Sequence, residues 1–275
     1  ECALAYIGTS DGTAQPSNSS TGGASAFNRV KPCTTFTDRL RELDDPRASV
    51  WFAPVAIPIK VVAAADVPGG EDDVVVDGVR YINEETLADN GLKIYDKNTW
   101  KADRLAGLSL VDTSSTYVGL PVSYQGSEPY TYNLNPNPVQ GGGNVHVSLM
   151  NDQFKEASGD FLKARVLSYA EVCFLKAEAA LKGWGTDAEG NYNKGVQASL
   201  DTWGIGDEYA DYIDNAEVAF DGTLAQIMEQ KWIANFATAS ESYLDWRRTG
   251  LPDLQTGPFA LSSVIPVRFQ YPDEE

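Results

Sequence analysis

The clearest hydrophobic periodicity in the chain begins after Asp160. In RVLSYAEVCFLKAEAALKGW, residues 165–184, apolar and small side chains recur three and four positions apart, and the run closes at Gly183. This spacing predicts an amphipathic helix of about five turns. A second helical pattern, residues 192–203, ends at Gly204. The two segments predict an antiparallel hairpin, and their many Ala and Gly residues are typical of tetratricopeptide-type repeats.

Three further segments carry helical patterns. TLAQIMEQKWIANFA, residues 223–237, aligns its apolar residues on one stripe, and SESYLDWRRTGLP, residues 240–252, has Ser240 as a candidate N-cap and Gly250 as a left-handed cap. The shorter TTFTDRLRELDDPR near the start predicts a helix that ends before Pro46. Four tryptophans fall on helical stripes and are expected in the core: Trp184, Trp203, Trp232 and Trp246.

The segment from 50 to 148 has a different composition, rich in Val, Tyr, Gly and Pro. In DDVVVDGVRYI an Asp77-Gly78 turn separates two short apolar runs, which predicts a small β-hairpin within irregular structure. We therefore expect a mainly α fold, in which tetratricopeptide-like helical hairpins are joined by long irregular loops and small β-hairpins.

The predicted organisation is a single region, residues 1–275. Residues 36–59 and 149–275 form its helical scaffold, and residues 60–148 form a loop-rich insertion that is the candidate ligand face.

Charge narrows the range of partners. Lys and Arg number 21 against 39 Asp and Glu, which gives a formal net charge of -18. A surface of that sign repels phosphate backbones, so nucleic acid is excluded as an expected partner. No apolar run approaches the roughly 18 residues that would span a bilayer. The first residues resemble neither an initiator Met nor a signal sequence, so we expect the chain to be a piece of a longer one.

Motifs for catalysis, cofactors and metals are missing from the sequence. His146 is the single histidine, and there is no HExxH, GxSxG, phosphate-binding GxxxxGK or CxxC pattern. We therefore predict no cofactor and no metal. A glycoside hydrolase could use paired carboxylates, and adjacent acid pairs are present, although such pairs are usually solvated surface. The pairs considered are Asp44-Asp45, Asp72-Asp73 and Glu84-Glu85.

Two glutamates interrupt the apolar pattern of the first predicted helix. Glu171 and Glu178 are seven positions apart and so share one face. A buried carboxylate needs a partner, and arginine can bind one through two parallel hydrogen bonds. We predict that Arg247 or Arg248, on the last predicted helix, pairs with Glu171 or Glu178. The alternatives are that these arginines interact only with carbonyls at the helix end, or contact a ligand directly.

Exposed aromatic rings beside amides suit either a sugar or an extended peptide, because sugar C–H faces stack on rings while amides fix hydroxyl groups. The best cluster of this kind lies in the loop-rich insertion. The alternative is that these rings pack the loop onto the helices. The candidate ligand-binding residues are Trp100, Tyr117, Tyr124, Tyr130, Tyr132, Asn133 and Asn135.

Several of these segments, taken in order, resemble the SusD/RagB family of Bacteroidota, and in particular its SusD-like nutrient-binding outer-membrane lipoproteins. The resemblance runs from about residue 36 to the end and is weakest between 60 and 148. The segments that carry it are LRELDDPRASVWF, YAEVCFLKAEAALKGW, YNKGVQASLDTWG, IMEQKWIANF, ESYLDWRRTGLPDL and IPVRFQYPDEE.

The resemblance implies a binding protein rather than an enzyme. It implies a lipoprotein on the extracellular face of the outer membrane that captures oligosaccharides, or alternatively peptides, for a SusC-like TonB-dependent barrel transporter. Contact with the membrane would be made only through a lipid anchor outside this segment. It also implies that the N-terminal half of the family is absent from this chain.

Overall fold

A computed structural model describes residues 2–6, 30–94, 110–122, 131–135, 143–156, 159–257 and 260–268. The α-helices are α2 (Thr34–Glu42), α3 (Arg47–Trp51), α4 (Glu84–Asp89), α7 (Tyr169–Leu181), α8 (Ala188–Thr202), α9 (Tyr209–Ile213), α10 (Leu224–Ala234) and α11 (Ala239–Thr249). The strands are β1 (Cys2–Tyr6), β2 (Phe52–Ala53), β3 (Ile59–Val62), β4 (Asp73–Val76), β5 (Val79–Asn83), β6 (Lys93–Ile94), β7 (Leu110–Val111), β8 (Leu149–Met150) and β9 (Gly159–Leu167). The predicted class, mainly helical with a few small strands, is confirmed.

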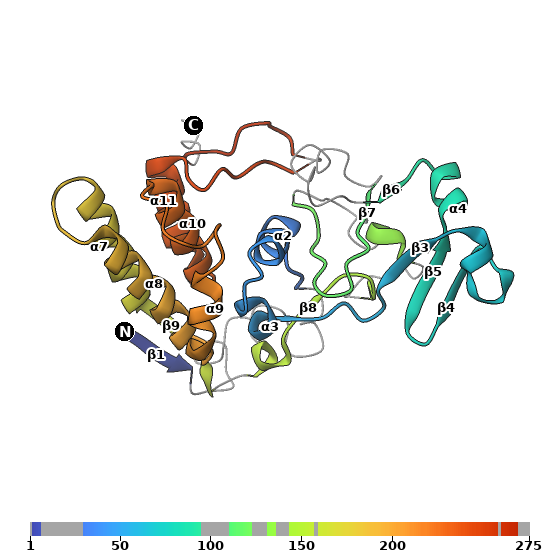
Figure 1. The fold of residues 1–275 in the computed structure, drawn as a ribbon, viewed down its shortest axis with the longest axis horizontal. Coiled ribbons are helices and arrows are strands. Elements are labelled where there is room, and N and C mark those ends of the chain that lie inside the picture. Colours follow the sequence, from blue (N-terminus) through green and yellow to red (C-terminus); the bar gives the residue numbers. More distant parts are fainter. Residues whose placement is uncertain are drawn as a thin grey trace, which may run out of the picture.

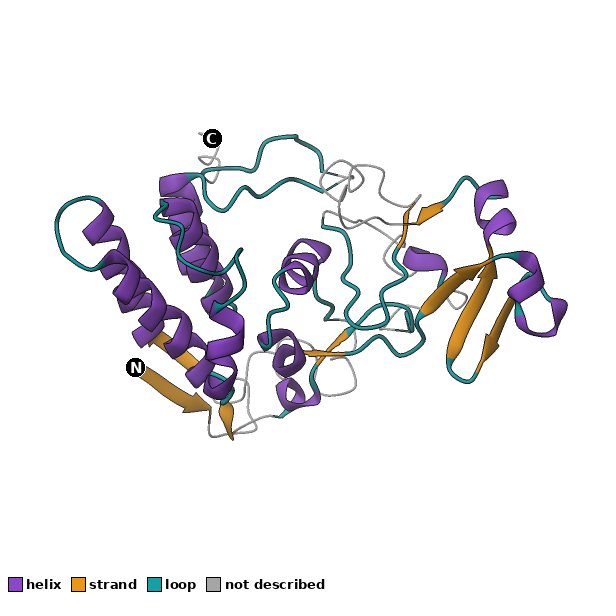
Figure 2. Cartoon of the chain, viewed as in Figure 1, coloured by secondary structure: helices purple, strands orange, loops and turns teal. Residues whose placement is uncertain are grey.

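The elements are arranged along one axis (Figure 1). The hairpin of α7 and α8 lies at one end beside α10 and α11, and the small sheet of β3, β4 and β5 lies at the other. The short helices α2 and α3 lie between them, as the colouring by secondary structure also shows (Figure 2). Residues near position 40 therefore connect the helical end of the molecule to its loop-rich end.

The predicted hairpin of α7 and α8 is present, with a corrected start. Residues 165–167 belong to β9, which pairs antiparallel with β1, so α7 begins only after Ser168, whose side chain accepts a hydrogen bond from Glu171 N at 3.0 Å. The strand pairing overrides the helical spacing of those residues. Gly195 lies so close to Phe174 that an added Cβ would be 2.8 Å from its ring, so the glycine allows α7 and α8 to approach closely.

The second helical pair, α10 and α11, follows its predicted limits closely. The Thr223 side chain accepts a hydrogen bond from Gln226 N and caps α10. Gly250, with φ of 71°, ends α11 in the left-handed conformation predicted for it. The N-cap of α11 is Thr238, two residues before the predicted Ser240, which instead lies in the first turn of the helix.

The tryptophan prediction is correct only in part. Trp203 is buried, and Trp232 and Trp246 are half-buried. The prediction that Trp184 lies in the core is wrong. Its side chain is 81% exposed, because α7 ends at Leu181 and the chain turns away before reaching it.

The predicted β-hairpin forms between β4 and β5. Asp77 and Gly78 have φ of 51° and 76°, the left-handed pair that a tight two-residue turn requires. The same strand β5 also pairs in parallel with β3, which completes a three-stranded sheet. The remaining pairs of described strands are β1 with β9, β2 with β8 and β6 with β7.

The main core joins α2 and α3 to the helical hairpins through aromatic rings. Trp51 stacks on Phe236 with ring centroids 4.4 Å apart and meets Trp203 edge-on at 5.4 Å. Phe36 lies 5.0 Å from Trp232 and 5.3 Å from Phe236. These contacts link segments nearly two hundred positions apart, so the core depends on long-range packing.

A fully buried arginine lies beside this aromatic core. Arg47 donates to both carboxylate oxygens of Asp45, at 2.8 and 2.5 Å, and to Ser199 of α8, Tyr212 of α9 and Gln230 of α10. Tyr212 in turn donates to Asp45 at 2.7 Å. Burial alone would lower the pKa of Arg47, but Asp45 and Tyr212 outweigh it and hold that pKa above its ordinary value.

None of the helices in the described ranges has both the length and the apolar character needed to cross a bilayer.

Replacing Arg47 by Met should lower the free energy of unfolding by about 3 to 5 kcal/mol, because Asp45 would remain buried without its charged partner. Chemical denaturation followed by circular dichroism measures this. Lys194→Met, at an exposed position of α8, is the matched control and should change stability by no more than about 0.5 kcal/mol. Equal effects of the two substitutions would contradict the assignment of Arg47 as the buried link.

Candidate functional site

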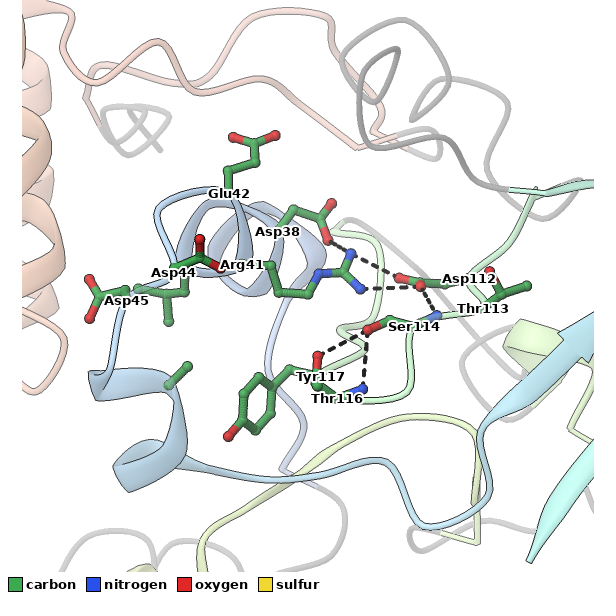
Figure 3. A pocket seen from close by; sticks show the side chains of 12 residues that line it. Asp38, Arg41, Glu42, Asp44, Asp45, Asp112, Thr113, Ser114, Thr116 and Tyr117 are labelled. Atoms are coloured by element: carbon green, nitrogen blue, oxygen red, sulfur yellow. Dashed lines mark hydrogen bonds and ion pairs between the residues drawn. The ribbon is translucent and has the colours of Figure 1, made fainter. Parts of the chain in front are cut away.

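A polar pocket opens between α2, the turn that leads to α3, and the segment from 112 to 117 (Figure 3). Its volume is about 490 Å³. Carboxylates, hydroxyl groups and one aromatic ring dominate its lining. The polar and aromatic lining residues are Asp38, Arg41, Glu42, Asp44, Asp45, Asp112, Thr113, Ser114, Thr116 and Tyr117.

Arg41 ties the two walls of the pocket together. Its guanidinium donates to Asp38, one helical turn earlier on α2, at 2.5 Å and to both oxygens of Asp112 at 3.2 Å, as the dashed lines in Figure 3 show. Asp112 directly follows strand β7 and also accepts from Ser114 N at 2.9 Å. Burial raises the pKa of Asp112, and Arg41 offsets that rise only in part. The ion pair therefore fixes the segment after β7 against α2.

The remaining acids of the pocket are mostly held by other groups. Glu42 accepts from Arg39 at 3.0 Å, and Asp45 is bound by Arg47 inside the core. Only Asp44 is an exposed carboxylate. Within the described ranges no three His, Cys, Asp or Glu side chains are placed to hold a metal ion. The carboxylates, hydroxyl groups and tyrosine ring of the lining suit recognition by hydrogen bonding and stacking.

Tyr117 supplies the aromatic surface of this pocket. It is half-buried, its ring meets Phe52 edge-on at 6.3 Å, and partial burial raises the pKa of its hydroxyl. Figure 3 shows this hydroxyl pointing away from Arg41. Nearby, the exposed hydroxyls of Ser114 and Thr116 lie 3.1 Å apart. One ring, two hydroxyls and several carboxylates form a combination that suits the C–H faces and hydroxyl groups of a sugar.

The other ligand-binding candidates have different placements. Tyr132, Asn133 and Asn135 are buried, at 4%, 4% and 6% exposure. The Asn133 side chain donates to the backbone carbonyls of Asp112 and His146 at 3.0 and 3.1 Å and accepts from Asp112 N at 2.8 Å. It thereby positions Asp112 from behind, which is a supporting role. Trp100, Tyr124 and Tyr130 lie outside the described residues.

The acid pairs Asp72-Asp73 and Glu84-Glu85, considered for glycoside hydrolysis, have structural roles. Asp73 binds Arg80 through both of its oxygens, at 2.8 and 2.6 Å, and Asp72 accepts from Asn83 at 3.4 Å. Glu84 and Glu85 open helix α4 in its first turn, where acids are favoured by the helix dipole.

Three of the four predicted ion-pair residues, Glu171, Glu178 and Arg248, lie in one network that joins α7, α10 and α11. Arg248 of α11 donates to both oxygens of Glu178 on α7, one of these contacts measuring 2.9 Å, and it also donates to Asp245 at 2.9 Å. Lys182 donates to Glu178 from the next turn at 2.6 Å. The hydrogen bonds of Arg248 thus connect the first helical hairpin to the second.

Glu171 and Arg247 have partners that the pattern did not indicate. Lys231 of α10 lies 3.5 Å from Glu171 and 2.7 Å from Asp245. Arg247 is exposed, and its guanidinium lies 5.7 Å from the centroid of the Tyr243 ring. A lysine within the apolar stripe of the third predicted helix was the available signal for the partner of Glu171.

Comparison with protein families identifies one match. The profile of the SusD-like family described as "Starch-binding associating with outer membrane" matches residues 109–272. Comparison with curated proteins finds no match.

Solved structures share the fold. A Bacteroidetes SusD-like protein is 21% identical with a TM-score of 0.55, and the match covers 99% of this chain and 54% of that protein. An outer membrane protein of Bacteroides vulgatus, described as involved in nutrient binding, is 20% identical with a TM-score of 0.56, covering 98% and 50%. A chitin-binding protein is 22% identical with a TM-score of 0.51, covering 87% and 42%. The chain thus spans about half the length of the structures it matches.

Replacing Arg248 by Met should lower the free energy of unfolding by about 1 kcal/mol, a value reduced because this side chain is 42% exposed. The Glu178 carboxylate would then keep only its hydrogen bond from Lys182. Arg247→Met, the same change at the neighbouring position, removes no carboxylate contact among the described residues and should cost less. Denaturation curves of the two variants measured together decide this, and a larger loss for Arg247→Met would overturn it.

Glu178 should make stability depend on pH in one direction. Burial would raise its pKa, but hydrogen bonds from Arg248 and Lys182 outweigh burial and place the pKa below its ordinary 4.5. Its contribution is therefore fully present above the unfolded pKa and is lost as pH falls through the folded pKa. Unfolding of Glu178→Gln should differ from the unsubstituted chain more at about pH 7 than at about pH 3. A gap that widens toward acid would contradict this.

Proposed function

The chain belongs to the SusD-like family described as starch-binding and associating with the outer membrane, and from that premise we propose that it captures oligosaccharides at the cell surface for uptake. The family is one of binding proteins rather than enzymes. The observation that carries the proposal is the family match over residues 109–272, which includes the polar pocket segment from 112 to 117.

The pocket is the proposed site of capture. Tyr117 offers a ring for stacking, while Ser114, Thr116 and Asp44 offer groups that exchange hydrogen bonds with sugar hydroxyls. The chitin-binding neighbour supports a glycan as ligand. Trp100, Tyr124 and Tyr130 belong to the same loop-rich insertion and are proposed to extend the aromatic surface. In this proposal the buried Tyr132, Asn133 and Asn135 shape the site from behind.

We propose a domain organisation in which residues 36–59 and 149–275 form the scaffold and residues 60–148 form the insertion. The pocket supports this division, because its walls are residues 38–48 of the scaffold and residues 112–117 of the insertion. The hairpins α7–α8 and α10–α11 are proposed to be tetratricopeptide-like units that hold the scaffold rigid. A rigid scaffold with a ligand-bearing insertion is a common arrangement for binding sites.

The cellular setting is proposed from the family. The protein acts on the extracellular face of the outer membrane, held by a lipid anchor outside this segment, and passes its ligand to a SusC-like TonB-dependent barrel transporter. The association with the outer membrane in the family's description supports this setting. A peptide is the alternative ligand, because a cleft bordered by acids also suits basic extended chains.

Calorimetric titration of the chain with maltoheptaose, chitohexaose and a basic peptide tests the proposal. Saturable binding of an oligosaccharide without new reducing ends is expected. Tyr117→Ala should weaken it by about 3- to 10-fold, the value of one aromatic stacking contact, whereas Tyr117→Phe should keep it. Tyr81→Ala, at a half-buried tyrosine of β5 in the small sheet, is the matched control and should bind normally. Binding of the peptide alone would support the alternative, and cleavage of the sugar would refute both.

A further inference from the structure

A second cavity, of about 560 Å³, lies on the other side of α2, between that helix, α10, α11 and the segment near residues 254 and 265. Unlike the polar pocket, it is lined largely by aromatic rings, several of which touch one another. Phe36 contacts Trp232, and Tyr243 stacks on Trp246 with centroids 6.4 Å apart. The rings that line it are Phe36, Phe52, Trp232, Phe236, Tyr243 and Trp246.

Two nitrogen donors in this apolar lining lack acceptors. Asn235 is 2% exposed, and its Nδ2 is buried without a hydrogen-bond partner among the residues that the structure describes. The same holds for Nζ of Lys31, in the segment that precedes α2. Buried donors are satisfied in the large majority of cases, so a pair of unsatisfied ones in a single cavity calls for an explanation.

The charge of the Lys31 ammonium group indicates which kind of acceptor this cavity requires. Burial lowers the pKa of Lys31 from 10.5 to about 8, and no carboxylate in the described part of the chain forms an ion pair with it. It remains largely protonated at neutral pH, so the cavity holds a positive charge without a counter-charge. An acceptor that carries a negative charge would satisfy both the ammonium and the amide.

We propose that this cavity binds a small carboxylic acid with an apolar, ring-bearing body. The carboxylate oxygens accept hydrogen bonds from Lys31 and Asn235, and the apolar body packs among the aromatic side chains. A neutral sugar would leave the Lys31 ammonium without a counter-charge, because sugar hydroxyl groups carry no charge at neutral pH. The site therefore differs in chemistry from the polar pocket, and its ligand is separate from the captured glycan.

Titration with 3-phenylpropionate, followed by calorimetry and by the intrinsic tryptophan fluorescence to which Trp232 and Trp246 contribute, tests this on the whole chain. The neutral analogue 3-phenylpropanamide has the same ring and a carbonyl acceptor but no charge, and it should bind at least about tenfold more weakly. Lys31→Met should lose this preference for the acid. It should also fold at least as stably without ligand, because it removes an unpaired buried charge.

Two further variants keep the outcome decisive. Asn235→Asp places a carboxylate where the ligand's own would bind, and should abolish binding of 3-phenylpropionate. Lys194→Met, on the exposed face of α8, should leave it unchanged. Equal affinity for acid and amide, unchanged binding by Lys31→Met, or no saturable binding because another polypeptide segment fills the cavity would each overturn the proposal. Oligosaccharide binding by Lys31→Met should stay normal, so failure of this inference is distinguishable from failure of the proposed function.

Discussion

The guanidinium of Arg47 joins the central α2–α3 segment to the helical end of the molecule. It lies at the start of α3, fully buried, and its hydrogen bonds reach Asp45 in the preceding turn and one side chain each on α8, α9 and α10. A buried charge is tolerated only when its donors are satisfied, so these helices must all be in place together. The position of α2, which ends just before this turn, is thereby fixed relative to the helical hairpins.

Helix α2 is the shared wall of both cavities, and the geometry of a helix explains how. Successive side chains diverge by about 100°, so neighbouring residues face different surroundings. Phe36 points into the aromatic cavity, whereas Asp38 and Arg41 line the polar pocket, and Arg39 binds Glu229 of α10 through both of its oxygens. A single short helix thus separates a site suited to sugars from one suited to an apolar acid.

Arginines bind carboxylates inside the protein, and this allows a chain with a strong negative charge to form a packed interior. Arg39, Arg41 and Arg248 each bind one carboxylate through two hydrogen bonds, and each of these contacts joins segments that are distant in sequence. Arg47 and Arg80 bind carboxylates in the same way at positions close to them in the chain. The acids that remain exposed leave the net charge at -18. This division keeps the surface acidic while the pairs inside act as specific connections between elements.

The sequence by itself determined the features that depend on neighbouring residues. Helical periodicity located α8, α10 and α11, Gly250 marked the end of α11, and Asp77-Gly78 marked the hairpin, because backbone conformation and amphipathic spacing are local properties. Features that depend on distant residues were decided by the tertiary structure. Pairing with β1 turned the start of the predicted first helix into strand β9, which its spacing could not reveal.

The candidate site divides in the same way. Tyr117 was recognised from the composition of its loop segment, and Glu171 and Glu178 were recognised from their position in an apolar row. Both signals lie within a few residues. Asp112 and Arg41 meet across 71 positions, and the partner of Glu171 lies on another helix, so no local pattern could select them. The local pattern therefore indicated that Glu171 and Glu178 need partners, whereas only the packing of helices against one another decided which partner each of them has.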